Sequence, residues 1–261
     1  MKAFRAVLAA LALSSAGQAC AVGNLADLSV YDRTDGRQLA VHWHQGRAYV
    51  VGKPGNEYQV MLRNRSREEV LAVVSVDGVN VVSGESADPS QTGYVLGPYR
   101  SYEILGWRKS LAETAAFYFT SLPDSYAART GRPDNVGVVG VAVFRKKPEP
   151  QPIAPYLGQG APAAAQAKRE ASADASGPRA AEQESRLGTG HGRREASEVR
   201  QVAFERASSN PAETLTIYYD SYRNLVARGV IREPVPVAPC ATPNCSPLPR
   251  PFPGFVPDPR G

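Results

Sequence analysis

Apolar and polar residues alternate along several short stretches of the chain, with the period of two that a β-strand produces. Tyr58, Val60 and Leu62 stand at every second position of one such stretch. Residues 70–76 (VLAVVSV) are rich in β-branched side chains, and an Asp-Gly pair separates them from residues 79–82 (VNVV). Because a tight hairpin turn needs residues that tolerate a positive φ, this pattern predicts a β-hairpin that turns at residues 77–78.

Further strand candidates share short length, apolar or aromatic residues and nearby turn residues. They are residues 28–31, 39–43, 93–96, 102–107, 115–120 and 136–144. The last of these is almost entirely apolar, which predicts burial on both faces near the middle of the core. Many short strands with regular turns predict an all-β domain over residues 22–147, either a β-sandwich or a jelly-roll-like fold.

The composition changes after Lys147. Residues 148–187 are rich in Pro, Ala, Gly and charge, and hold too few apolar residues to fold, so we expect a disordered linker. Order is expected again in residues 188–232, with strands at 199–205 and 215–219 and a short helix from Ser221 that stops near Gly229. Two strands and a helix are too little to fold alone. We therefore expect this strand-strand-helix segment to dock on an edge of the β domain. Residues 233–261 form a Pro-rich tail with ten prolines from Pro234 onward.

The N-terminus has the features of a secretory signal peptide. Lys2 and Arg5 precede an apolar run over residues 6–13, and the chain then reaches Ala-Cys-Ala at residues 19–21. We expect residues 1–21 to be removed and the protein to be exported to the periplasm or the extracellular space. Lipoprotein anchoring through Cys20 is the alternative, although Gly17 and Gln18 do not fit its usual signal. No other apolar stretch is long enough to span a bilayer.

Charge and cysteine content narrow the function further. The chain has 30 basic and 25 acidic residues, and the excess is spread along its length rather than gathered in a patch. We therefore expect no binding to nucleic acid. Cys240 and Cys245 lie in the Pro-rich tail, and in an oxidising compartment we expect them to form a disulfide.

Histidines are the weak candidates for a metal site. His42 and His44 would share one face of a strand, and His191 could join them only if its loop folds back. We expect neither a metal nor a cofactor, because no carboxylate stands near the pair in sequence. His191 lies in a Gly-x-Gly-x-Gly sequence at residues 188–192, which resembles a phosphate-binding loop but lacks the strand and helix around it. We interpret it as a flexible hinge.

Aromatic residues are the remaining candidates for a binding surface. Five of them cluster in the second half of the β domain: Tyr94, Tyr99, Tyr102, Trp107 and Tyr126. They could grip a sugar or a partner, although filling the core is the simpler role for such residues. The polar stretch 124–131 is expected to be a loop, and loops on a rigid scaffold often carry binding sites. Trp107, Asp124, Tyr126 and Arg129 are the residues that we select for this surface.

Several segments resemble a group of secreted bacterial β-rich proteins of unknown function. They are VLAVVSVDGVNVVSG (70–84), GYVLGPYRSYEILGWRKS (93–110), AAFYFT (115–120), DSYAARTGRPDNVGVVGVAVF (124–144) and FERASSNP with IYYDS (204–211, 217–221). The resemblance implies export and one fold unit that includes the C-terminal segment, and it assigns no catalytic residue.

Three classes of function remain open. The first is a non-enzymatic interaction or structural role in the cell envelope, with an envelope protein or a glycan as partner. The second is a module that binds a carbohydrate or another small ligand, and the third is a secreted hydrolase. An exposed aromatic cluster would favour the second class, and converging carboxylates or histidines the third.

Overall fold

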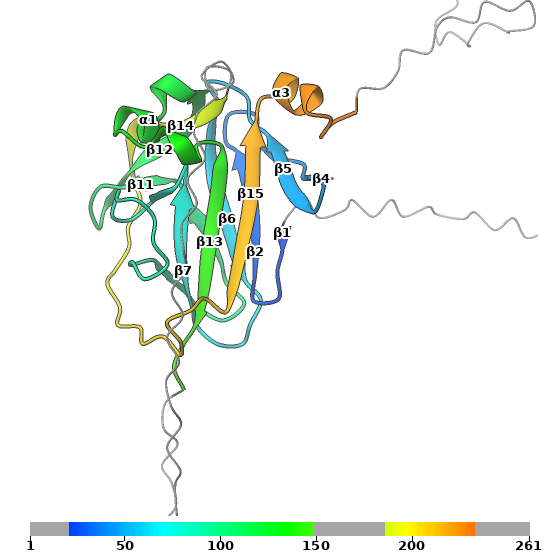
Figure 1. Ribbon diagram of the computed structural model, residues 1–261. Coiled ribbons are helices and arrows are strands. Elements are labelled where there is room, and N and C mark those ends of the chain that lie inside the picture. The colour runs from blue at the N-terminus through cyan, green and yellow to red at the C-terminus, as the bar shows by residue number, and fades with distance from the viewer. Residues whose placement is uncertain (1–20, 149–185, 233–261) are drawn as a thin grey trace, which may run out of the picture. The chain divides into compact units, whose positions relative to one another are not determined.

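The computed structural model describes residues 21–148 and 186–232, with side chains from residue 23 onward. Two β-sheets face each other across a common core, so the expected all-β sandwich is confirmed (Figure 1). Sheet A contains β1 (Ala21–Val22), β2 (Ala26–Asp32), β3 (Arg37–Gln38), β6 (Glu57–Asn64), β10 (Ser101–Ile104), β11 (Gly106–Arg108), β12 (Glu113–Ser121) and β14 (Leu187–Ala196). Sheet B contains β4 (His42–His44), β5 (Arg47–Val51), β7 (Val70–Val76), β8 (Val79–Asn80), β9 (Tyr94–Leu96), β13 (Val138–Arg145) and β15 (Glu213–Asp220).

The alternating residues of the predicted strands fill the space between the sheets. Tyr58, Val60 and Leu62 of β6 point into the core from sheet A, and Val139 and Val141 of β13 point into it from sheet B. β13 lies between β7 and β15, so its predicted central place is confirmed. The burial predicted for both faces is wrong, because Val139, Val141 and Val143 are buried but the residues that alternate with them, from Val138 to Ala142, are only partly buried.

The predicted hairpin turn between β7 and β8 is present. Asp77 and Gly78 have φ values of 53° and 71°, and the strands on either side pair antiparallel. Other strands differ in detail from the expectation. The strand expected at residues 102–107 is divided into β10 and β11, and β5 was not predicted.

The C-terminal segment is built into both sheets. β14 pairs with β12 in sheet A, whereas β15 lies inside sheet B between β13 and β5 and runs parallel to β5. The expectation that both strands cap an edge is therefore wrong for β15. The strand expected at residues 199–205 is also wrong, because the first strand of the segment is β14, which begins where we expected the linker to end. Helix α3 (Tyr222–Ala227) begins as predicted after Ser221, whose hydroxyl accepts a hydrogen bond from the backbone of Asn224.

Two glutamates join the C-terminal segment to residues 24–33. The Glu213 carboxylate accepts hydrogen bonds from the backbone N–H groups of residues 24, 25 and 26 at 2.5–3.1 Å. Arg33 makes a bidentate pair with Glu195 of β14, with both N–O distances at 2.7 Å. Such bidentate, partly buried pairs hold geometry better than single surface contacts. The segment is thus a structural part of the sandwich.

Inside the core, a buried chain of hydrogen-bonded polar groups links the β domain to the C-terminal segment. The Asp77 carboxylate accepts hydrogen bonds from the Tyr219 hydroxyl at 2.5 Å and from the backbone N–H groups of Gly137 and Thr189 at 2.9 and 2.7 Å. The Thr189 hydroxyl contacts the hydroxyls of Tyr58 and Tyr219, each at 2.6 Å. Burial raises the pKa of Asp77 to about 6, against the opposing effect of these hydrogen bonds.

Three expectations concern residues outside the described ranges. They are the signal peptide up to residue 20, the linker from residue 149 to residue 185, and the tail from residue 233 with Cys240 and Cys245. Ala21, the expected last residue of the signal peptide, is described and pairs with Leu28. Within residues 21–148 and 186–232, no helix has the length and apolar character needed to cross a bilayer.

Candidate functional site

Trp107 belongs to the core rather than to a binding surface. Its side chain is 3% exposed, and its indole Nε1 donates a hydrogen bond to the carbonyl oxygen of Gly190 at 3.1 Å. The ring lies 5.1 Å from Phe117 and 4.7 Å from Tyr126, centroid to centroid. The selection of Trp107 as a surface residue is therefore wrong, because β14, not foreseen as a strand, supplies the partner for its indole.

The stretch expected to be a polar loop contains two short helical turns instead. Residues 122–124 form a 3-10 turn, and α1 (Tyr126–Arg129) follows with Ser125 as its N-cap. Asp124 and Arg129 are exposed, and Asp124 accepts a hydrogen bond from the Ser121 hydroxyl. Tyr126 is half-buried between the rings of Trp107 and His191. These residues leave a small polar surface and bring no cluster of exposed aromatic rings together.

The three histidines do not converge. His42 and His44 lie on β4 in sheet B, whereas His191 lies on β14 in sheet A and stacks on Tyr126 at 5.8 Å. Partial burial, followed by the nearby charge of Lys109, lowers the pKa of His191. Among the described residues, no three His, Cys, Asp or Glu side chains form a group that could hold a metal ion.

The Gly-x-Gly-x-Gly sequence is a tightly packed strand, so its interpretation as a hinge is wrong. A methyl group on Gly188 would lie 2.6 Å from Cβ of Ser125, and one on Gly190 would lie 2.2 Å from the Tyr118 ring. On the opposite face of β14, Thr189 joins the buried polar chain. The alternating glycines therefore make room for neighbours on one face while the other face is anchored in the core.

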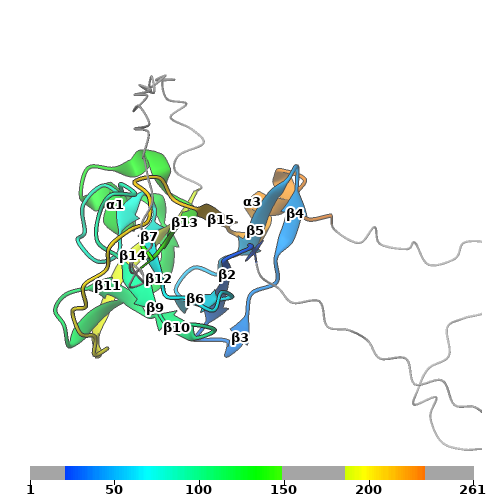
Figure 2. The ribbon, with the colours of Figure 1, turned by 90° about the horizontal axis from the view of Figure 1, so that it is seen from below.

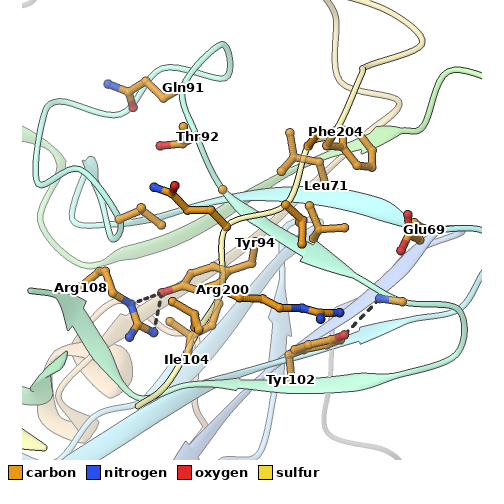
Figure 3. A pocket seen from close by; sticks show the side chains of 18 of the residues that line it. Glu69, Leu71, Gln91, Thr92, Tyr94, Tyr102, Ile104, Arg108, Arg200 and Phe204 are labelled. Atoms are coloured by element: carbon orange, nitrogen blue, oxygen red, sulfur yellow. Dashed lines mark hydrogen bonds between the residues drawn. The ribbon is translucent and has the colours of Figure 1, made fainter. Parts of the chain in front are cut away.

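A large cavity lies beneath residues 197–206, which we call the strap. The strap leaves β14 and runs along the outside of the sandwich toward β15 (Figure 2). Between the strap and strands β9 and β10 is a groove with a volume of about 1430 Å³. Figure 3 shows Tyr94, Tyr102 and Ile104 of these strands around the same space as Arg200 and Phe204 of the strap.

Arg108 of β11 holds the first end of the strap. Its guanidinium donates hydrogen bonds to the carbonyl oxygen and to the hydroxyl of Ser197, and to the Tyr94 hydroxyl at 3.3–3.4 Å (Figure 3 shows the bonds to Tyr94). The backbone N–H groups of Ser197 and Val199 also donate to the carbonyl oxygens of Ala112 and Leu111. One side chain thus fixes the strap and one aromatic wall of the groove together.

A small second core and an arginine hold the other end. Phe204 packs against Leu71, Val73 and Phe144 on the outer face of sheet B. The Arg206 guanidinium lies 4.1 Å from the Phe144 ring centroid and donates to the carbonyl oxygens of residues 89 and 91. The strap is therefore fixed at both ends.

The groove follows strand edges rather than one sheet face. Residues 102, 103 and 104 of β10 all line it, as do residues 93, 94 and 95 at β9, although neighbouring side chains on a strand point to opposite faces. Among the described residues, β9 pairs only with β7, and β10 only with β6. Each strand therefore turns an edge without a strand partner toward the groove.

The walls combine apolar and charged side chains. Val202 and Leu111 are 50% and 54% exposed, and Tyr102 is 37% exposed. Charges of both signs line the groove: Arg100, Arg108, Arg200 and Arg206, with Glu69, Glu103 and Glu198. Tyr94 and Tyr102 belonged to the predicted aromatic cluster. Residues 199–205 of the strap were expected to form a strand, but they have no regular secondary structure, so their place over the groove was not predicted.

Comparison of the chain with protein-family models, with curated proteins and with solved structures found no significant match.

Proposed function

We propose that this protein is a non-enzymatic interaction module of the cell envelope, which binds an extended segment of a partner protein in the groove beneath the strap. The observation that carries the proposal is that the groove runs along the edges of β9 and β10. An extended peptide gains affinity at such an edge because its backbone groups pair with those of the strand, while side chains on both walls select its sequence.

The size of the groove favours a chain over a compact ligand. Sites for small molecules usually enclose about 300–1,000 Å³, and the groove exceeds that range at about 1430 Å³. Val202 and Leu111 expose apolar side chains that would be covered by a bound peptide. Serine and threonine hydroxyls line the groove, but among the described lining residues no histidine accompanies them as a general base, which favours binding over nucleophilic catalysis.

Export is part of the same proposal. It is supported by the signal-like N-terminus, with Lys2, Arg5 and the apolar run before Ala21, and by the resemblance to secreted bacterial proteins. Removal of the signal between Ala21 and Val22 would leave the segment that Glu213 binds at the new N-terminus.

A selection of random ten-residue peptides on the purified protein tests the binding function. We expect the selected peptides to shift the backbone amide NMR signals of β10 and of the strap. The Val202→Asp substitution should weaken the affinity for these peptides by about tenfold or more, because a charge would enter an apolar contact. Trp43→Ala is the matched control, since Trp43 is 61% exposed on β4, outside the groove. Peptides that bind Val202→Asp as tightly as the wild type would refute the proposal.

A glycan is the second candidate occupant. The rings of Tyr94 and Tyr102 line the groove, and aromatic rings can stack on sugars. An oligosaccharide array separates the two candidates, because sugar binding that Tyr102→Ala abolishes, together with no selected peptide, would favour the glycan.

A further inference from the structure

A second cavity lies on sheet B where β5, β15 and the end of α3 meet. Its volume is about 260 Å³, and Tyr49 and Tyr218 form its aromatic part. The two tyrosines are paired neighbours on β5 and β15, and their ring centroids are 5.4 Å apart. None of its lining residues belongs to the groove beneath the strap.

Arginine side chains are held in place over these rings. The guanidinium of Arg47 lies 5.6 Å from the Tyr218 ring centroid, and that of Arg228 lies 5.6 Å from the Tyr49 ring centroid. Arg186 lines the same cavity and donates a hydrogen bond to the carbonyl oxygen of Val136 at 2.9 Å. Stacking and hydrogen bonding reduce the freedom that each side chain would lose on binding a ligand.

The positive charge of this cavity is only partly compensated. Asp220 pairs with Arg228 at 3.5 Å and also accepts hydrogen bonds from Ser221 and Asn224. Asp134 is at the wall, but within the described residues neither Arg47 nor Arg186 has a carboxylate within ion-pair distance.

A neighbouring cavity of about 550 Å³ shares Arg186 and Leu187 with the first. Its other lining residues are Pro54, Ser121, Ser221, Arg223 and Asn224, which include hydroxyl and amide groups but no carboxylate. The two cavities together are lined by four arginines and two aspartates, a formal charge of +2. Arg186 stands where they meet.

We propose that these joined cavities, centred on Arg186, bind the phosphate group of a phosphate monoester or diester. Guanidinium groups match the geometry of phosphate oxygens and donate paired hydrogen bonds to them. A phosphate monoester carries a charge of about −1.5 to −2 near pH 7, which balances the charge of the lining. The Ser221 hydroxyl accepts a hydrogen bond from the backbone of Asn224 and keeps its own proton to donate to a remaining oxygen. This site is independent of the peptide-binding groove.

Calorimetric titration of the full chain with glycerol phosphate at constant ionic strength tests the proposal. We expect one saturable site, and Arg186→Gln should weaken binding by about tenfold or more, as expected for losing a charge-assisted hydrogen bond. Arg47→Gln should also weaken it, and because Arg47 is exposed its loss should not disturb folding. The matched control is Arg145→Gln, an exposed arginine of β13 that lines neither cavity and should bind like the wild type.

Two further arms identify the source of the phosphate and exclude general anion binding. Vesicles of phosphatidylglycerol, with phosphatidylcholine vesicles as reference, reveal whether a lipid headgroup is the preferred source. Binding that depends on Arg186 in either phosphate arm supports the proposal. It is overturned if neither glycerol phosphate nor the anionic vesicles bind, if acetate binds equally well, or if Arg145→Gln weakens binding as much as Arg186→Gln does.

Discussion

The buried carboxylate of Asp77 gives the stability of the protein a distinctive dependence on pH. Burial raises its pKa from 3.8 to about 6. Because the folded state then holds this proton more tightly than the unfolded chain, the contribution of Asp77 to the free energy of unfolding is greatest below pH 3.8. It is lost as the pH rises to about 6. The difference corresponds to roughly 3 kcal/mol.

Asp77→Asn should remove this dependence. Urea denaturation of both proteins at pH 4 and at pH 7 measures it, and the stability advantage of the wild type over the variant should be larger at pH 4. An advantage that is equal at the two pH values, or larger at pH 7, would show that Asp77 does not titrate as its burial requires.

The packing of β14 makes a second prediction for single residues. Gly188→Ala should reduce the free energy of unfolding by about 1–3 kcal/mol, because its methyl group would overlap Ser125 and Val136. Gly97→Ala is the control, since its nearest neighbour would be 3.6 Å away, and it should change stability by less than about 0.5 kcal/mol. Equal denaturation midpoints for the two variants would mean that β14 is not packed as described.

At this scale the sequence predicts what depends on near neighbours. The Asp77-Gly78 turn and the helix start at Ser221 can both be predicted from the sequence, because the residues that determine each of them lie within a few positions of one another. The contacts of Tyr58 with Thr189 and of Tyr219 with Asp77 join residues 131 and 142 positions apart. Local sequence patterns do not predict contacts between residues so far apart, so the buried polar chain was not predicted.

Among the elements, the strap is the one on which the proposed groove depends. Arg108→Met keeps the apolar stem of the side chain but removes its hydrogen bonds to Ser197 and Tyr94. We expect faster hydrogen exchange at the amides of Ser197 and Val199 and a loss of about 1–2 kcal/mol in stability. Tyr94→Phe removes only one hydroxyl and should have a smaller effect. Unchanged protection of these amides in Arg108→Met would show that Arg108 does not hold the strap.

Strands whose own residues favour extended structure were predicted. Strands that form because of contacts with residues far away in the sequence were missed. β7 and β13 are rich in valine, and both were predicted. β14 contains three glycines, which weaken a strand taken alone. It forms because β12 supplies a partner along its length and because Tyr118 and Ser125 fill the space that the glycines leave.

For the whole molecule, the C-terminal segment completes the sandwich. Without it, β5 and β13 lose the strand between them, and the core loses Leu215, Ile217 and Tyr219. Truncation after Leu187 should therefore abolish cooperative unfolding and cause aggregation, as size-exclusion chromatography and thermal melting would show. Deletion of residues 150–180 should lower the stability much less, because the entropic cost of closing a loop changes slowly with its length. Removal of the tail from Pro234 should lower the stability even less than that deletion.

The central claim is that the C-terminal segment is a structural part of the sandwich, and both proposed sites need that segment in place. Cleavage of the intact protein between β13 and β14 tests this claim most directly. A specific protease site introduced between residues 150 and 180 would divide the folded chain into two fragments. We predict that the fragments elute together under native conditions and unfold in one transition, close to the temperature of the uncut protein. The claim would be contradicted if the fragment that contains Tyr218 and Tyr219 separated freely while the remaining fragment kept its melting temperature.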